Sequence, residues 1–369
     1  MWEIYEIIRP RDVCIAGVAR TLMGGLLGSL SSIPATKLGS TAVACALERA
    51  NVDPSLVQEV FFGKVLSTNL GQAPARQAAL GADIPNSVVW TTIDKGTIRT
   101  CTLINLLVFA ATMIAAQSIQ TGVNDIVVAG GMESMSNAPK YLAQASIGSR
   151  LGHDTIIDGM LRDGLWDVYN DFTMGICGEL CAKQHKITKE EQAISYAIAC
   201  TCSLIGGHRS LTLSFSPSAN TVQVSGGRGK PPTLFDKDEG LGKMDKKFPS
   251  IAFEPSKLKN LHPSFKENGT VTAGNVSIIR VFPSTVLVDS DGAAALVLVS
   301  GEEAFQLGLQ VIAKIKGFAD AAQVVALANQ KLLGLDPVPR QRSGKYGVAA
   351  VCNGGGGAFA LFLEHMYVL

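Results

Sequence analysis

The sequence lacks an excess of charge of either sign. Its 369 residues include 32 lysines and arginines and 31 aspartates and glutamates, which gives a formal net charge of +1. Proteins that bind nucleic acid or anionic lipid through charge carry basic patches or stripes. Because the composition supplies no such excess, we expect neither a nucleic acid nor a membrane as a partner.

Long apolar runs are also missing. The most apolar stretch, residues 103–116, has 14 residues and contains Asn105, whereas a helix needs roughly 20 apolar residues to cross a bilayer. Residues 1–10 are charged and end in proline, unlike the apolar core of a secretory leader. The sequence therefore predicts a cytoplasmic protein.

Metal-ligand spacing is absent as well. The eight cysteines are scattered, and the close pairs Cys177 with Cys181 and Cys200 with Cys202 lack the partner cysteines or histidines of a zinc site. We expect no metal. We also expect reduced thiols rather than disulfides, as is usual for a large intracellular chain.

What the sequence does have is glycine and small apolar residues in alternating strand-like and helix-like segments. Hydrophobic residues make up 47% of the chain, with 38 glycines, a mixture typical of helices packed on buried strands. The alternation predicts an α/β fold with a mostly parallel sheet, whose ligands gather at the carboxyl ends of the strands. The expected strands are residues 13–18, 57–65, 88–93 and 125–129, the last ending at Gly130 and Gly131, and the expected helices are 35–50, 72–81 and 110–120.

The pattern loosens between residues 134 and 286, which are rich in loops apart from a helix start at Thr188. Long loop-rich insertions in α/β domains usually form lids or binding surfaces. The regular pattern returns at residues 291–299 and continues to the end, and no internal repeat is evident.

One cysteine stands at the end of an apolar run, directly before a group of glycines. Residues 347–352 read as a buried strand that ends at Cys352, and residues 354–357 are all glycine. Glycines in such a turn let backbone N–H groups face a ligand or a developing negative charge. Two interpretations stay open: a thiol placed for acyl or proton transfer, or a buried cysteine that caps a strand.

Four segments carry a family resemblance when they are read together and in order. They are residues 69–81, 128–136, 269–275 and 347–357. In this combination the chain resembles the thiolase family, most closely its plant-type cytosolic acetoacetyl-CoA thiolases (acetyl-CoA C-acetyltransferases). The resemblance implies a layered αβαβα fold of two similar halves with an inserted loop domain that binds coenzyme A. It assigns residues 1–136 and 287–310 to the first half, 137–286 to the loop domain and 311–369 to a truncated second half.

The same resemblance implies a chemistry. In thiolases one cysteine attacks a thioester to form an acyl-enzyme, and a second removes or returns the α-proton of acetyl-CoA. Cys352 matches the second cysteine, and Gly354 supplies a backbone donor to the oxyanion. The substrates are acetyl-CoA and acetoacetyl-CoA, and no cofactor is bound permanently. The family usually forms a homodimer or homotetramer and supplies isoprenoid precursors.

Four further residues match positions along the pantetheine arm of coenzyme A in this family: Met174, Phe265, Ala273 and Ser277. An apolar wall with one hydroxyl group suits that thin, amide-bearing chain. Ordinary loop packing is the alternative interpretation, and it stays open for Met174 and Phe265.

The sequence departs from the family at the acylated cysteine. In thiolases that cysteine opens a helix within a Cys-Ala-Ser-Gly context. Counting forward from Lys95 puts the position at Thr97, and counting back from Met113 puts it at Asn105. Cys101 lies four residues from both, about one helical turn, and is the candidate thiol at the active centre. The alternative is that Cys101 is an ordinary helix residue.

Two other catalytic segments of the family have no counterpart here. An Asn-Glu-Ala-Phe motif is expected before residue 324, and a Gly-His-Pro motif with the activating histidine is expected between residues 334 and 345. Loss of a nucleophile or its base typically lowers the rate by about 10⁴ to 10⁶. We therefore expect little or no turnover, and the alternative function is a non-catalytic coenzyme A-binding or subunit-partner protein.

Overall fold

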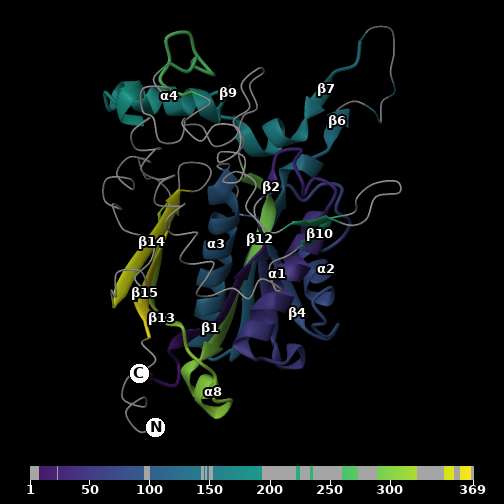
Figure 1. Cartoon of the computed structure of the whole chain (residues 1–369), viewed down its shortest axis with the longest axis vertical. Coiled ribbons are helices and arrows are strands. Elements are labelled where there is room, and N and C mark those ends of the chain that lie inside the picture. The colour runs from purple at the N-terminus through teal and green to yellow at the C-terminus, as the bar shows by residue number, and fades with distance from the viewer. Residues whose placement is uncertain are drawn as a thin grey trace.

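The computed structural model contains one large sheet with helices against it and smaller elements, most of which lie at the top of the view (Figure 1). Nine strands form the sheet in the order β14-β15-β13-β1-β12-β5-β3-β4, with β2 paired to β12. Within the described part of the chain, no helix is both long and apolar enough to span a membrane. The structure describes residues 8–22, 24–94, 100–142, 145, 148, 153–192, 222–224, 233–235, 260–272, 289–321, 345–352 and 358–366.

The large sheet and its helices come from both ends of the chain, and the smaller elements come from the middle. The sheet strands are β1 (Val13–Arg20), β2 (Gly24–Gly25), β3 (Glu59–Gly63), β4 (Val89–Ile93), β5 (Ile126–Ser134), β12 (Asp289–Ser300), β13 (Ala313–Ala321), β14 (Tyr346–Cys352) and β15 (Ala358–His365). The helices beside them are α1 (Ala35–Ala50), α2 (Pro74–Leu80), α3 (Thr100–Gln120) and α8 (Gly301–Gln306). Three small sheets pair β6 (Lys140–Leu142) with β7 (Ile156–Asp158), β8 (Trp166–Asp167) with β9 (Phe172–Thr173), and β10 (Val222–Val224) with β11 (Thr233–Phe235), and α4 (Met174–Gln184) contacts β9.

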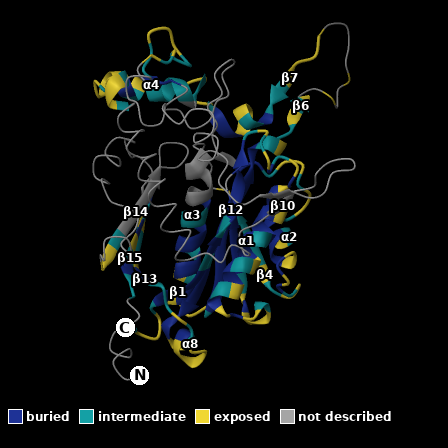
Figure 2. Ribbon diagram, viewed as in Figure 1, coloured by how far each residue is buried: buried dark blue, intermediate teal, exposed yellow. Residues whose placement is uncertain are grey.

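Helix α3 separates two parts of the sheet. Successive strand residues point to opposite faces, so Val128 joins the core under α1 and α2, whereas Val127 joins the core under α3. The α3 core also contains Ile315 and Phe359 from the last strands. Helix α3 contacts both β3 and β14, which lie near opposite ends of the strand order. The sheet therefore wraps around α3 to give the layers helix, sheet, helix, sheet (Figure 2).

Most expected elements of the first half are confirmed. Helix α1 has the expected bounds and ends at Asn51, whose backbone is left-handed with φ 54°. Helix α3 extends the expected segment at its amino end and begins at Thr100. Thr188 starts a helix as expected, because its Oγ1 accepts a hydrogen bond from the backbone N–H of Glu191 at 3.2 Å.

The sheet is mixed, and the expectation of a mostly parallel sheet is wrong. Only the pairs β3–β4 and β3–β5 are parallel. The remaining main pairs, β5–β12, β12–β1, β1–β13, β13–β15 and β15–β14, are antiparallel. The reason is β12, which returns after the loop-rich region and inserts between β1 and β5. Alternating elements predict parallel pairs only where a helix connects sequential strands directly.

Strand β5 does not end at Gly130 and Gly131 as expected, but continues through both to Ser134. These glycines serve packing rather than a turn. A Cβ on Gly130 would lie 2.2 Å from the ring of Phe62 and 2.6 Å from the carbonyl oxygen of Ala294. Glycine in a strand interior often marks such a close approach.

The structure contains an internal repeat, as the two similar halves implied by the family resemblance require, although no repeat is evident in the residues themselves. Strands β1, β12 and β5 pair in the same way as β13, β15 and β14, and β1 and β13 have register shifts at Ile15/Gly17 and Ile315/Gly317. The two halves meet where β1 pairs with β13, in an antiparallel register centred on Cys14 opposite Lys314. The two halves therefore share the order and pairing of their strands, although their residues differ.

We predict that Gly130→Ala destabilises the protein by about 1 to 3 kcal/mol, the usual cost of overpacking a core. The added methyl group must displace the fully buried Phe62 ring or part the β5–β12 ladder. Urea unfolding measures the change. Gly317→Ala in β13 is the control, because among the described residues no atom outside its chain neighbours lies within 4 Å of its added Cβ. Equal stability of the two variants would contradict the packing role of Gly130.

Candidate functional site

The candidate site lies at the carboxyl ends of β3, β4 and β5, where parallel strands of an α/β sheet present ligand-binding loops. Helix α3 starts near this edge, after β4, and lies beside β14 and β15. A helix amino terminus carries partial positive charge and unpaired N–H groups. Helix amino termini are in general favourable places for an anion.

The two candidate cysteines lie on neighbouring elements. Cys101 is in the first turn of α3, and Cys352 is the last residue of β14, in register with Ala358. The side chains of both cysteines are outside the described residues, as is Gly354. Elsewhere, Cys14 is fully buried, and burial with the nearby carboxylate of Asp12 raises the pKa of its thiol to about 12. Cys14 is therefore not a nucleophile.

A buried ion pair fixes the strand ends at this edge. Lys64 follows β3, Glu133 lies near the end of β5, and each is 1% exposed. Lys64 Nζ donates to Glu133 Oε1. Glu133 also accepts from the backbone N–H groups of Val65 and Leu66, both at 3.2 Å, and of Ser134 at 3.1 Å. These bonds satisfy the carboxylate and hold the loop after β3 against β5.

A second buried carboxylate ties β12 to the same edge. Asp291 Oδ1 accepts from Ser134 Oγ at 3.0 Å and from the backbone N–H of Ser136 at 3.1 Å, and Asn137 donates to Ser134 Oγ at 2.9 Å. The other carboxylate oxygen of Asp291, Oδ2, is buried without a hydrogen-bond partner among the described residues. Burial, with a smaller contribution from Glu133, raises the pKa of Asp291. Desolvation thus favours the protonated carboxyl.

A further acidic residue lies at the end of β4. Partial desolvation and the nearby carboxylates of Glu133 and Asp163 raise the pKa of Asp94. Asp163 accepts a hydrogen bond from the hydroxyl group of Tyr141, whose oxygen lies 3.2 Å from the hydroxyl oxygen of Thr68 and accepts from it. The carboxylates of Asp94, Glu133 and Asp163 therefore lie near one another at the edge where α3 begins.

Two of the four residues predicted to contact the pantetheine arm, Met174 and Phe265, lie on described segments that contact each other. Met174 is the first residue of α4, and the ring of Phe265 covers the adjacent Gly175, whose added Cβ would lie 2.2 Å from that ring. Ala273 and Ser277 lie outside the described residues. Ordinary packing thus accounts for part of the surface of Phe265.

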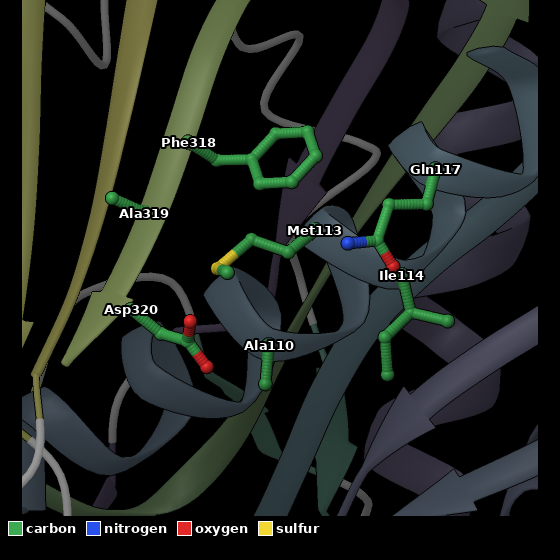
Figure 3. A pocket seen from close by; sticks show the side chains of 7 residues that line it. All are labelled: Ala110, Met113, Ile114, Gln117, Phe318, Ala319 and Asp320. Atoms are coloured by element: carbon green, nitrogen blue, oxygen red, sulfur yellow. The ribbon is translucent and has the colours of Figure 1, made fainter. Parts of the chain in front are cut away.

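A cavity of about 190 Å³ lies away from this edge, between α3 and β13. Figure 3 shows its lining side chains, with Met113 and Gln117 from α3 and Phe318 from β13. Its first lining residue on α3 is Ala110, roughly 14 Å along the helix from Cys101 at 1.5 Å per residue. No group of histidine, cysteine or acidic side chains within the described ranges could hold a metal ion.

Sequence reasoning missed the buried charges. Lys64 and Glu133 each interrupt an apolar strand segment, and Asp291 opens another. A charged residue inside such a run is seldom buried without a partner. That signal predicts paired burial, but it does not identify which charges pair, because the residues are far apart in sequence.

Comparison with known proteins shows similarity along nearly the whole chain. The sequence model of the thiolase N-terminal domain matches residues 13–302. The chain is 53% identical over 426 residues to acetyl-CoA acetyltransferase 2 of Arabidopsis thaliana, covering 97% of this chain and 98% of that protein. It is 38% identical to an acetyl-CoA acetyltransferase of Schizosaccharomyces pombe, covering 96% and 99% of the two chains. A crystal structure of the Bacillus anthracis acetyl-CoA acetyltransferase superposes with a TM-score of 0.80 at 28% identity, covering 96% of this chain and 99% of that one.

We predict that Lys64→Met and Glu133→Gln each destabilise the protein by about 3 to 5 kcal/mol, because each leaves a buried charge without its partner. The double variant should lose less stability than the sum of the single losses. Urea unfolding measures all three. Lys140→Met, which removes an exposed ion pair with Asp158, is the control and should change stability little. Additive single losses would show that the two charges are not coupled.

Asp291 gives a prediction for pH dependence. Because the native state raises its pKa above the ordinary value of 3.8, the native state binds this proton more tightly than the unfolded chain. The stability that Asp291 contributes through this proton is fully present below pH 3.8. It is lost as pH rises through the raised pKa of the native state. Asp291→Asn keeps an Oδ1 acceptor and does not ionise, so the variant should gain stability relative to wild type as pH rises.

Urea unfolding of wild type and Asp291→Asn between about pH 4 and pH 8 tests this sign. Asp291→Ala, which also removes the acceptor for Ser134 and Ser136, should be less stable than Asp291→Asn at every pH. A difference between wild type and Asp291→Asn that stays constant with pH would refute the raised pKa.

Proposed function

This chain belongs to the thiolase family, and from that premise we propose that it is an acetyl-CoA C-acetyltransferase. It transfers an acetyl group between coenzyme A thioesters, toward acetoacetyl-CoA or in reverse. The observation that carries the proposal is the similarity to an Arabidopsis acetyl-CoA acetyltransferase over 97% of the chain. Acetyl-CoA and acetoacetyl-CoA are the substrates, and no permanent cofactor takes part.

The reaction needs two thiols with different tasks. One thiolate attacks the carbonyl carbon of acetyl-CoA, the carbon–sulfur bond to coenzyme A breaks, and the departing sulfur takes up a proton. A second thiolate removes the α-proton of another acetyl-CoA. The resulting enolate carbon attacks the acyl-enzyme and releases the first thiolate. Both steps place negative charge on an oxygen, which oriented N–H groups stabilise.

The two tasks fall to the cysteines on α3 and β14. Cys101 lies in the first turn of α3, where a helix amino terminus lowers a thiol pKa, and we assign it the acyl attachment. Cys352 removes and returns the α-proton, with the backbone of Gly354 as oxyanion donor. The contact between α3 and β14 supports a shared site.

The remaining assignments concern the loop domain and the assembly. Residues 137–286 form the coenzyme A-binding domain between a first half of 1–136 with 287–310 and a truncated second half of 311–369. Met174, Phe265, Ala273 and Ser277 line the pantetheine arm; the contact of Phe265 with the first turn of α4 supports this grouping. The protein works in the cytoplasm as a homodimer or homotetramer and supplies isoprenoid precursors.

A second candidate function is non-catalytic binding of coenzyme A or of a partner subunit. The sequence has Thr97 at one expected nucleophile position and no Gly-His-Pro motif. The alignment with the Arabidopsis relative spans 426 positions, 57 more than the chain has residues. This excess supports the proposal that segments of the relative are missing here, which would lower turnover while leaving the loop domain able to bind.

We predict that thiolysis of acetoacetyl-CoA is at least about 10⁴-fold slower than for the Arabidopsis relative assayed in parallel, because the activating base is missing. Coenzyme A should nevertheless raise the melting temperature of this chain, as any ligand of the native state does. Turnover at the relative's rate would refute the lost-machinery argument. Absence of any stabilisation by coenzyme A would refute the acetyltransferase and the coenzyme A-binding protein, and would leave binding of a partner subunit.

The location of residual chemistry is tested by intact mass after incubation with acetyl-CoA. A single acetyl adduct should map to Cys101 and disappear in Cys101→Ala. It should form in Cys352→Ala, because the proton-transfer thiol is not needed for acylation, and in the control Cys45→Ala, whose thiol lies on α1. An adduct on Cys352 would reverse the two assignments.

A further inference from the structure

Helix α4 carries residues 260–272 on one side, seen as the green loop above it in Figure 1. The contact face includes Gly175 and Glu179, which are four residues apart and so lie on the same side of the helix. Glu179 is only 7% exposed, although it belongs to a short helix at the periphery of the fold. A carboxylate is rarely buried unless its oxygens are fully bonded.

Among the described residues, the hydrogen bonds of the Glu179 carboxylate go to the chain segment above it. Its Oε1 accepts from the backbone N–H of Val271 at 2.7 Å, and its Oε2 accepts from the N–H and the Oγ1 of Thr270 at 2.8 and 3.1 Å. A Cβ on Gly269 would lie 2.3 Å from Oε1, so only glycine lets the backbone approach this closely. These charge-assisted bonds are stronger than bonds between neutral groups.

The segment held by Glu179 is closed on itself. Pro263 and Thr272 form an isolated β-bridge, and the N–H of Ser264 donates to the carbonyl oxygen of Val271 at 2.8 Å. Phe265 lies inside this loop, and its ring fills the space over Gly175. Because residues 264 and 271 are bonded to each other, holding residues 270 and 271 on α4 also holds Phe265 in place. The Phe265 ring then lies over Gly175, one helical turn before Glu179.

We propose that Glu179 is a positioning residue for coenzyme A binding. It anchors the loop of residues 263–272 on α4, and so presents Phe265 to the pantetheine arm. This inference rests on the proposed function, since it concerns the same binding site. Glu179 itself is bonded inward to the loop and acts through it.

The test compares Glu179→Ala, Glu179→Gln and the control Glu190→Gln, which makes the same charge change at an exposed position. Calorimetric titration with coenzyme A gives the affinity, and hydrogen exchange at the Thr270 and Val271 amides reports the anchor. We expect Glu179→Ala to weaken binding about tenfold or more and to speed exchange at both amides. Glu179→Gln, which retains one acceptor oxygen, should fall between Glu179→Ala and wild type, and Glu190→Gln should match wild type.

Gly175→Ala provides an independent variant that leaves Glu179 intact. Its methyl group must displace the Phe265 ring, so coenzyme A affinity should fall without faster exchange at Thr270 and Val271. This variant and Glu179→Gln carry the test if Glu179→Ala fails to fold. Wild-type affinity in Glu179→Gln despite faster exchange overturns the positioning role alone. Failure of wild type to bind coenzyme A overturns the proposed function and this inference together.

Discussion

Burial of α3 on two sides is the constraint on which the rest of the structure depends. The helix has apolar residues around most of its circumference, and its core joins Val127 of β5 with Ile315 and Phe359 of the last strands. A helix that is apolar all round must be enclosed rather than laid on a single surface. The last strands of the chain therefore curve back over α3, which brings β14 and β15 into contact with this helix.

Buried charges provide the local order that apolar packing cannot. The Lys64–Glu133 pair and Asp291 bind backbone N–H groups at the edge where β3, β5 and β12 meet. Apolar contacts are non-directional, whereas these hydrogen bonds fix which backbone groups face one another. Glu179 has the same relation to its loop, with both oxygens bonded to backbone N–H groups. In each case an acidic side chain orders a segment next to the proposed site.

The sequence predicted local elements well and long-range relations poorly. Helix α1 and strand β4 follow from hydrophobic periodicity and cap signals, which depend only on neighbours in sequence. The insertion of β12 between β1 and β5, the packing of Phe62 against Gly130 and the pairing of Lys64 with Glu133 depend on residues far apart in the chain. Of the candidate site, the strand ending at Cys352 is confirmed. The roles of Cys101, Cys352 and the pantetheine residues remain proposals, because they follow from family resemblance and several lie outside the described residues.

The seam between β1 and β13 has a consequence for assembly. The strands meet over three residue pairs centred on Cys14 opposite Lys314, and the buried ammonium group of Lys314 lies 2.9 Å from Asp12 of the first half and 3.6 Å from Glu364 of the second half. If two copies of the second half joined through β13 in this register, two lysines would face each other without water. Like charges brought together in a dry interior repel strongly. The register of β1 with β13 therefore favours pairing of a first half with a second half over pairing of two second halves.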